Sequence, residues 1–208
     1  MIDTIKHRRT GWIPQLAFVT ALAAAAALAP AQANAATDDG IVQPMKTGSS
    51  CLDGLRDDTG RSSVDGREIR FTNSTKYDDA QSHAHAGWTS SGLSQIKLKG
   101  DAWNTSNDLD WKEKNKKDGA LATWTRHGGS GATDTIEMND YYLHQGRPGT
   151  WDTPFYRRAA AAHELGHALG LCHKSAAYGS SIMVKSAGDI PSIKPTSRDR
   201  GDYHKLWG

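Results

Sequence analysis

Three histidines within residues 163–173 have a spacing that suits a shared metal ion. His163 and His167 are four residues apart, so on a helix their imidazoles leave the same face one turn apart. Gly170 can take the left-handed conformation that ends a helix, which would turn the chain and bring His173 to the same metal. Three neutral imidazoles around Zn²⁺ leave a fourth position for water, the pattern of a catalytic rather than a structural zinc site.

Glu164 follows the first of these histidines. It is predicted to stand beside the water without binding the metal. Zinc lowers the pKa of bound water towards neutrality, and a neighbouring carboxylate can take the proton as attack on a carbonyl begins. The carboxylate can then pass that proton to a leaving amine. The motif therefore predicts amide hydrolysis with Glu164 as general base, a role that a purely structural zinc would not require.

The elements that must position these residues follow from local patterns. Phe155 to about Leu169 is predicted to be the helix that carries the motif, with Thr153 as N-cap and Pro154 at the first helical position. Alternating apolar residues predict strands at 68–72, 96–98, 120–125 and 134–139, and a spacing of four predicts a helix from Asp78 or Asp79 through Trp88. The polar stretch 100–118 is predicted to be irregular, with Trp103 and Trp111 as anchors.

Residues 1–35 have the order of an export signal. Lys6, Arg8 and Arg9 precede an apolar run over 12–29, and Ala33-Asn34-Ala35 offers the small-x-small pattern of a cleavage site. A membrane anchor is the alternative, because the run reaches the minimum spanning length of roughly 18 residues. We expect removal of residues 1–35, secretion into the extracellular space, and no membrane partner after that.

The net charge of the chain gives a second indication about partners. The formal value of +2 arises within residues 1–35, where Lys6, Arg8 and Arg9 outnumber Asp3. The remaining chain is balanced and has no basic cluster, which argues against nucleic acid as a partner. We expect a monomer that acts on a protein or peptide substrate.

Two cysteines, Cys51 and Cys172, remain after the predicted cleavage. An even number in an exported chain favours a disulfide between them. The alternative is that the Cys51 thiolate caps the zinc and keeps the site latent. Residues 36–66 are rich in Gly, Ser, Asp and Thr and are predicted to be a flexible leader or short propeptide. His83 and His85, two residues apart on a predicted helix, point in different directions and are expected at the surface.

The zinc run resembles that of the metzincins, a family that also has a methionine-containing Met-turn. Ser181-Ile182-Met183 lies where that turn would be expected. Within the metzincins, the sequence is most similar to the matrixins. Its C-terminal stretch from Asp199 to Gly208 resembles their last helix, and the stretches 67–71, 119–122 and 134–139 resemble three of their strands. The similarity covers residues 67–208, which would form the catalytic domain.

The resemblance implies an α/β (α+β) fold of the zincin type. Its twisted, mixed five-stranded sheet would have one antiparallel edge strand, accompanied by an active-site helix, the Met-turn and a C-terminal helix. Met183 would form a hydrophobic floor under the imidazoles, and the edge strand at Ala120, Leu121 and Ala122 would bind substrate. One catalytic Zn²⁺ is expected, while the family's structural zinc and calcium positions have no clear match.

The resemblance as a whole implies a secreted zinc metalloendopeptidase. A secreted zinc-binding protein without turnover, and a zinc amidase acting on cell-wall peptides, are the alternatives. His173 argues against the snapalysin branch, which has aspartate there, and Lys185 against the astacin branch, which has tyrosine.

Overall fold

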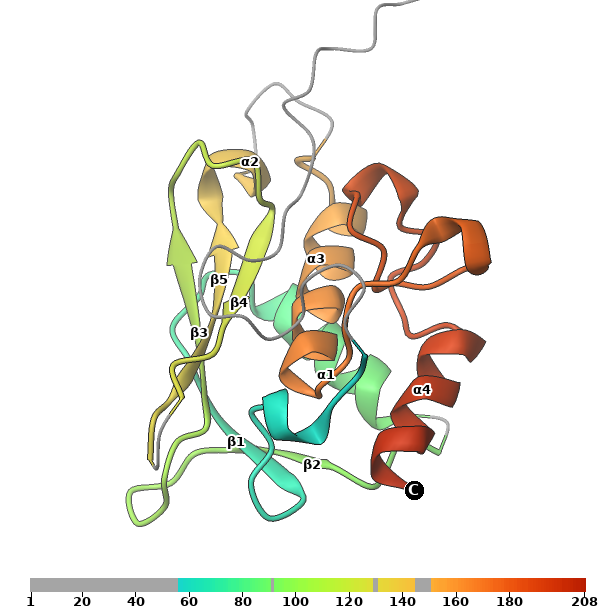
Figure 1. Ribbon diagram of the computed structural model, residues 1–208. Helices are drawn as coiled ribbons and strands as arrows, with labels where there is room; N and C mark the ends of the chain where they lie inside the picture. Colours follow the sequence, from blue (N-terminus) through green and yellow to red (C-terminus); the bar gives the residue numbers. More distant parts are fainter. Residues whose placement is uncertain (1–55, 91, 129–130, 145–150) are drawn as a thin grey trace, which may run out of the picture. The chain divides into compact units, whose positions relative to one another are not determined.

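The computed structural model describes residues 56–90, 92–128, 131–144 and 151–208 (Figure 1). Among them, no helix has the length and apolar character needed to cross a bilayer. The strands are β1 (Glu68–Asn73), β2 (Lys97–Gly100), β3 (Leu109–Lys114), β4 (Ala122–Thr125) and β5 (Asp134–Asn139). The helices are α1 (Asp78–Thr89), α2 (Asp140–Leu143), α3 (Pro154–Ala168) and α4 (Ser197–Trp207), with short 3-10 turns at Thr59–Arg61, Ala176–Tyr178 and Ala187–Asp189.

The five strands form one mixed sheet in the order β2-β1-β3-β5-β4. The pairs β1–β2, β1–β3 and β3–β5 are parallel. At one edge β4 runs antiparallel to β5, with Ala122 opposite Met138 and Trp124 opposite Ile136. The predicted α+β class and the mixed five-stranded sheet with an antiparallel edge strand are therefore confirmed.

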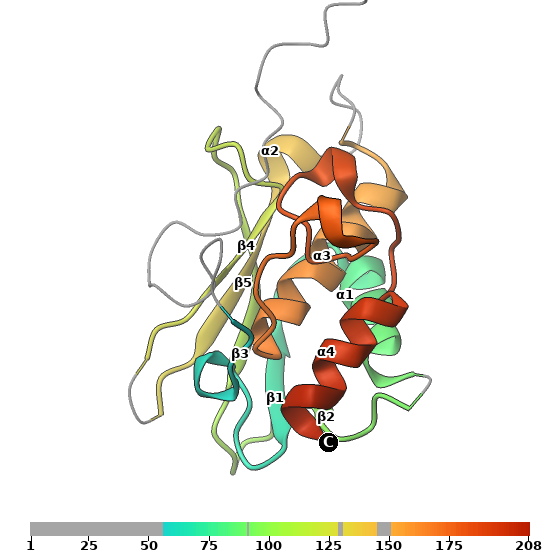
Figure 2. The same ribbon diagram turned by 45° about the vertical axis from the view of Figure 1, so that its right-hand side comes forward.

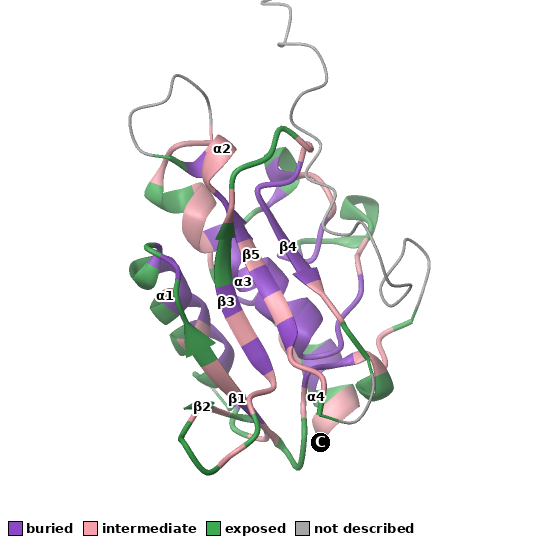
Figure 3. Cartoon of the chain, turned by 90° about the vertical axis from the view of Figure 1, so that its left-hand side faces the viewer, coloured by how far each residue is buried: buried purple, intermediate pink, exposed green. Residues whose placement is uncertain are grey.

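Helices α1 and α3 cover one face of this sheet (Figures 1 and 2). Successive side chains of a strand point to opposite faces, and most of the apolar residues that point towards the helices are fully buried: Ile69, Leu109, Trp111, Ile136 and Met138. Figure 3 shows the buried positions along β3, β5 and β4, with α3 behind them. The hydrophobic core therefore lies between the sheet and the helix that carries His163 and His167.

Helix α3 begins where its sequence predicts. The Thr153 side chain accepts a hydrogen bond from the Tyr156 N–H (3.3 Å), and Pro154 occupies the first turn. The alanines at 159–162 are buried, and their small side chains allow close packing of α1. Trp88 of α1 donates its indole N–H to the Ala162 carbonyl (2.8 Å). This contact fixes α3 against α1 directly before the first histidine.

Helix α4 closes the chain and holds the segment that precedes it. Thr196 and Asp199 form a reciprocal capping box at its start. Asp199 also accepts hydrogen bonds from the Ser181 hydroxyl and from the Ile182 N–H (3.0 Å). At the other end, the Trp207 indole N–H donates to the Leu169 carbonyl (3.0 Å). Helix α4 thus holds both the residues before Met183 and the end of α3.

Two local predictions were wrong. The stretch 100–118 contains β3, the central strand, in which Trp111 is buried, while Trp103 is 98% exposed. Pairing with strands distant in sequence stabilises β3. Because alternate residues of β3 are polar, its own sequence gives only a weak indication of a strand. Helix α1 starts after Tyr77, which provides no side-chain cap, and Asp78 and Asp79 lie in its first turn.

The folded part also begins earlier than predicted. Residues 56–66, predicted as the end of a flexible leader, instead pack beside the end of α3. The Ser63 N–H donates to the Ala168 carbonyl (2.8 Å), and the Ser63 hydroxyl donates to Asp134 of β5 (2.7 Å). The signal, residues 1–35, and the leader up to residue 55 lie outside the described residues.

Candidate metal centre

The three predicted ligand histidines meet in one place. Their ligand nitrogens all lie within 4.8 Å of one another. His163 and His167 are 2% and 0% exposed, whereas His173 is only partly buried. A cavity of about 630 Å³ borders His173 and is also lined by Lys174, Tyr178 and Leu206. The two helical histidines are thus fully buried, while His173 lies nearer the surface.

Hydrogen bonds set the orientation of the two helical imidazoles. Nδ1 of His163 lies 2.6 Å from the Ile182 carbonyl, and Nδ1 of His167 lies 2.7 Å from the Leu171 carbonyl. A carbonyl oxygen only accepts, so each Nδ1 carries the proton and each Nε2 has a lone pair. Burial and the neighbouring histidines lower the pKa of His163 to about 3 and that of His167 well below its usual value. Both rings are therefore neutral.

The Nε2 lone pairs of His163 and His167 face each other, and the distance between them can be compared with the distance between two ligands of one metal ion. Nε2 of His163 and Nε2 of His167 are 3.1 Å apart. Two acceptors at this distance repel each other unless a cation lies between them. Tetrahedral zinc with Zn–N distances of about 2.0–2.1 Å separates two ligand nitrogens by roughly 3.3 Å. The tautomers and the spacing of His163 and His167 fit a metal ion such as zinc, and the ligand nitrogen of His173 lies close enough to join them.

Glu164 is buried beside these imidazoles at the edge of the sheet. It is 1% exposed, and its Oε2 accepts a hydrogen bond from the Trp124 N–H of β4 (2.7 Å). Its Oε1 accepts no hydrogen bond from the described residues. Burial raises the pKa of Glu164 to about 8, against the opposing effects of the Trp124 N–H and the charge of Lys114. Sequence reasoning missed Trp124, because its role comes from its main chain and its type gives no signal.

Met183 lies against α3 in the segment held by Asp199. It is fully buried, and a Cβ on Gly166 would lie 2.4 Å from its sulfur. The glycine between Leu165 and His167 therefore makes room for this methionine. At the end of the helix Gly170 has a φ of +90°, as its position in the motif predicts, and a Cβ there would lie 2.7 Å from the Asp58 carbonyl oxygen. Both glycines permit close approach at the centre.

The predicted substrate-binding residues lie at and just before β4. Ala120, Leu121 and Ala122 are all buried. The Leu121 carbonyl accepts from the Asn139 N–H (2.8 Å), so it faces β5. Main-chain groups of an antiparallel strand alternate in direction, and those of Ala122 and Trp124 therefore face the outer edge. Ala122 thus has main-chain groups directed towards that edge, and it is 0% exposed.

The predicted disulfide involves Cys51, which lies outside the described residues. Its proposed partner Cys172 is fully buried, and the Cys172 sulfur lies 3.3 Å from the Arg56 carbonyl oxygen. The Cys51–Cys172 pairing stays a prediction, as does the alternative of a thiolate cap.

The two histidines of α1 lie apart from the centre. Nε2 of His83 lies 3.1 Å from the Ile193 carbonyl, and the His85 ring packs edge-on against Phe71 with 4.3 Å between ring centroids. They do not form a chelating pair. The surface position expected for His85 was wrong, because its ring is half-buried between Phe71 and Trp111.

This packing predicts a pH-dependent stability. Burial lowers the pKa of His85 to about 4, whereas an unfolded histidine titrates near 6.5. Between these values the unfolded state holds a proton that the folded state lacks, so stability falls as pH falls from about 6.5 to 4. On going from pH 7 to pH 5, His85→Leu should lose about 2 kcal/mol less unfolding free energy than the wild type.

Urea unfolding at the two pH values measures this difference, and the contributions of the other histidines cancel in the comparison. The exposed His127 provides the control, since His127→Leu should follow the wild type. Equal losses for His85→Leu and the wild type would contradict the expectation.

Comparisons with known proteins add little to this geometry. No family model matches the sequence, and no curated protein matches it. Among solved structures, the chain is similar to one in "GM1 bound form of the ECX AB5 holotoxin". The two are 14% identical, the alignment covers 68% of this chain and 70% of the other, and the TM-score is 0.38. A likeness at this level carries no argument about function.

Proposed function

We propose that this chain is a secreted zinc-dependent endopeptidase of the metzincin type, with His163, His167 and His173 as zinc ligands. The observation that carries the proposal is the facing pair of Nε2 lone pairs, 3.1 Å apart on two buried, neutral imidazoles. Neutral imidazole nitrogen is a preferred zinc ligand, and a three-histidine set leaves a position for water. The presence of Glu164 beside this set supports a hydrolytic rather than a purely structural role.

When bound, a zinc ion supplies Lewis acidity, which lowers the pKa of water and polarises a carbonyl group. The chain itself supplies the base. Trp124 holds Oε2 of Glu164, and Oε1 is left to accept a proton from the attacking water. Burial raises the pKa of Glu164 and so strengthens it as a base, while the positive charge of a bound zinc ion would favour its ionised form, which can take a proton from water and return it to a leaving amine.

The outer edge of β4 supports a peptide as substrate. The main-chain groups of Ala122 and the Trp124 carbonyl face outward beside Glu164. An extended peptide can pair with such an edge as an added strand, and this pairing does not depend on side-chain identity. An edge of this kind suits an extended peptide as substrate.

The export pattern of residues 1–35 and the balanced charge of the rest support the remaining parts of the proposal. Together they favour secretion and a protein or peptide substrate over nucleic acid. We propose that the secreted protein acts as a monomer.

The proposal is tested by incubating the purified protein with casein, with and without a chelator. We expect casein fragments from internal cleavage in the untreated sample. No new fragments should form once atomic absorption shows that the metal has been removed, and activity should return when zinc is added back. Mass spectrometry of the fragment ends separates internal cleavage from trimming of the termini.

Other outcomes separate the alternatives. Casein cleavage that continues after complete metal removal would refute the proposal. Stoichiometric zinc with intact casein would favour a zinc-binding protein without turnover. Release of peptides from purified cell wall, with casein left intact, would favour the amidase.

A further inference from the structure

His173 needs more support than the other two histidines. His163 and His167 are held by one helix at a spacing of four, whereas His173 follows Gly170 in a stretch that is neither helix nor strand. A side chain on irregular backbone is free to move unless other segments hold that backbone. The contacts around Cys172 and Lys174, the residues on either side of His173, therefore help to set where the third imidazole lies.

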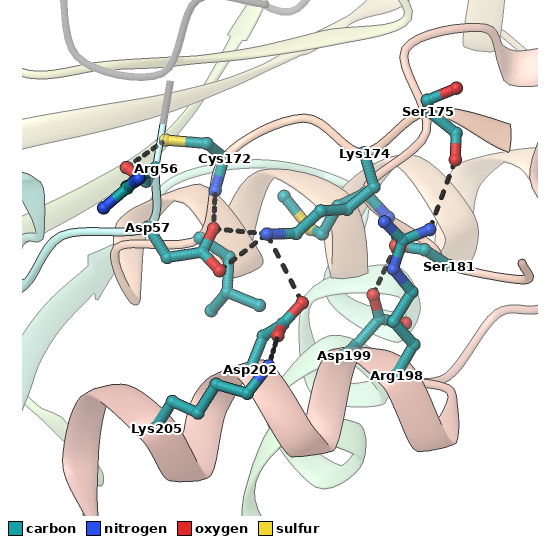
Figure 4. A network of polar contacts seen from close by, with 12 residues as sticks. Arg56, Asp57, Cys172, Lys174, Ser175, Ser181, Arg198, Asp199, Asp202 and Lys205 are labelled. Carbon is teal, nitrogen blue, oxygen red and sulfur yellow. Dashed lines mark hydrogen bonds and ion pairs between the residues drawn. The ribbon is translucent and has the colours of Figure 1, made fainter. Parts of the chain in front are cut away.

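One carboxylate holds the chain on both sides of His173. Oδ1 of Asp57 accepts a hydrogen bond from the Cys172 N–H (2.8 Å) and another from Nζ of Lys174 (2.6 Å). Oδ2 of Asp57 lies 2.6 Å from the same ammonium. Figure 4 shows the carboxylate between these two residues. Asp57 comes from the N-terminal segment, more than a hundred residues away in sequence.

A second carboxylate also contacts the Lys174 ammonium. Oδ2 of Asp202 on α4 lies 3.3 Å from Nζ of Lys174, and the Lys205 ammonium donates to Oδ1 (2.7 Å). The side chains of Asp57, Lys174 and Asp202 are only 12–15% exposed, so solvent and salt screen these ion pairs weakly. Burial alone would raise the pKa of Asp202, but the contacts with Lys205 and Lys174 outweigh it and lower that pKa.

Backbone contacts bring the N-terminal segment to the same turn. The Asp58 N–H donates to the Gly170 carbonyl (3.0 Å), and the Lys174 N–H donates to the Met183 carbonyl (2.8 Å). The absence of a side chain at Gly170 leaves the space that the Asp58 backbone occupies. Residues 57–63 thus run along the end of α3 and the turn that leads to His173.

We propose that Asp57 is a positioning residue for the metal centre, which places His173 by binding the Cys172 N–H and the Lys174 ammonium. The third ligand is then in place only while the segment of residues 56–63 is docked. Asp57 touches neither metal nor substrate and acts through the two neighbours of His173. This inference rests on the proposed function, because it takes the three histidines to be zinc ligands.

The test compares zinc affinity and the cobalt spectrum of Asp57 variants with those of the wild type. Loss of a residue that orients a ligand typically costs 10–100-fold in metal affinity. We expect a loss of this size in Asp57→Ala, measured by competition with a chelator. Asp57→Asn should lose less, because it keeps an acceptor for the Cys172 N–H and loses only the ion pair. The visible absorption of bound Co²⁺ should change in Asp57→Ala, because one imidazole is displaced.

Asp58→Asn is the matched control. Its side chain accepts from the Gly60 N–H and lies 3.6 Å from Arg61, away from Lys174. This variant should keep the zinc affinity and cobalt spectrum of the wild type. Zinc affinities are compared at a temperature where circular dichroism shows that every variant is folded. A general loss of stability then does not contribute to the measured difference in affinity.

Each outcome decides between the two claims. Unchanged zinc affinity and cobalt spectrum in Asp57→Ala, with zinc bound by the wild type, would overturn this inference alone. No zinc bound by the wild type would overturn the proposed function and this inference with it. If Asp57→Ala does not fold, Asp57→Asn and Lys174→Met decide, since both remove the ion pair with little change in volume. Wild-type affinity in both would then overturn the inference.

Discussion

Glu164→Gln should lower kcat for peptide hydrolysis by about 10³-fold while zinc stays bound. Glutamine keeps the volume of the buried side chain and an oxygen that can accept the Trp124 N–H. It cannot take a proton from water, so the attacking nucleophile is no longer generated by the chain. The three imidazoles are untouched, and zinc affinity should stay within a few-fold of the wild type.

Steady-state kinetics with a quenched fluorescent peptide, together with the zinc content, measure both parts of this expectation. Glu164→Ala should be equally inactive and also retain zinc. Glu137→Gln is the matched control, because Glu137 alternates with the buried Ile136 and Met138 on β5 and so points to the opposite face of the sheet. Full activity in Glu164→Gln would end its assignment as the base. Loss of zinc with normal folding would show that Glu164 supports the metal instead.

The second large effect is expected at the ligands themselves. His163→Ala removes one of the two facing Nε2 atoms and leaves the buried Ile182 carbonyl without its donor. Zinc sites with four ligands gain roughly 10–16 kcal/mol on binding, so one ligand contributes about a quarter of this. Zinc affinity should therefore fall by about 10²- to 10³-fold, and hydrolysis should fall to background at limiting free zinc.

Chelator competition measures the affinity, and thermal unfolding reports whether the chain is folded. His144→Ala is the control, since the His144 side chain is 46% exposed and lies beside Asp140, away from the centre. Wild-type zinc affinity in a folded His163→Ala protein would refute its role as a ligand. The two variants also separate the claims, since Glu164→Gln tests turnover and His163→Ala tests the metal.

Much of the scaffold could be predicted because it depends on local patterns. The hydroxyl of Thr153 and the ring of Pro154 mark the start of α3, and both act within one turn of the chain. The alternation in β4 and β5 is likewise visible in sequence. β3 was missed because only Leu109 and Trp111 are fully buried among its six residues, and a central position comes from partners far away in sequence.

The metal cluster itself was also predictable from sequence. The interval between His163 and His167 equals one helical turn, and Gly170 has the positive φ that the turn towards His173 requires. These relations extend over a few residues, so a local pattern contains them. The clustering of the three histidines therefore followed from residue types and spacing.

The sequence by itself thus determined which histidines cluster and that the cluster could hold a metal ion. Only the tertiary structure decided how they are held. The Ile182 and Leu171 carbonyls select the tautomers of the two helical imidazoles. Trp124 of β4 fixes one oxygen of Glu164, and Asp57 binds the main chain next to His173. Most of these partners come from segments distant in sequence and act through main-chain groups or ion pairs. Residue type does not reveal such contacts, because they exist only after the chain has folded.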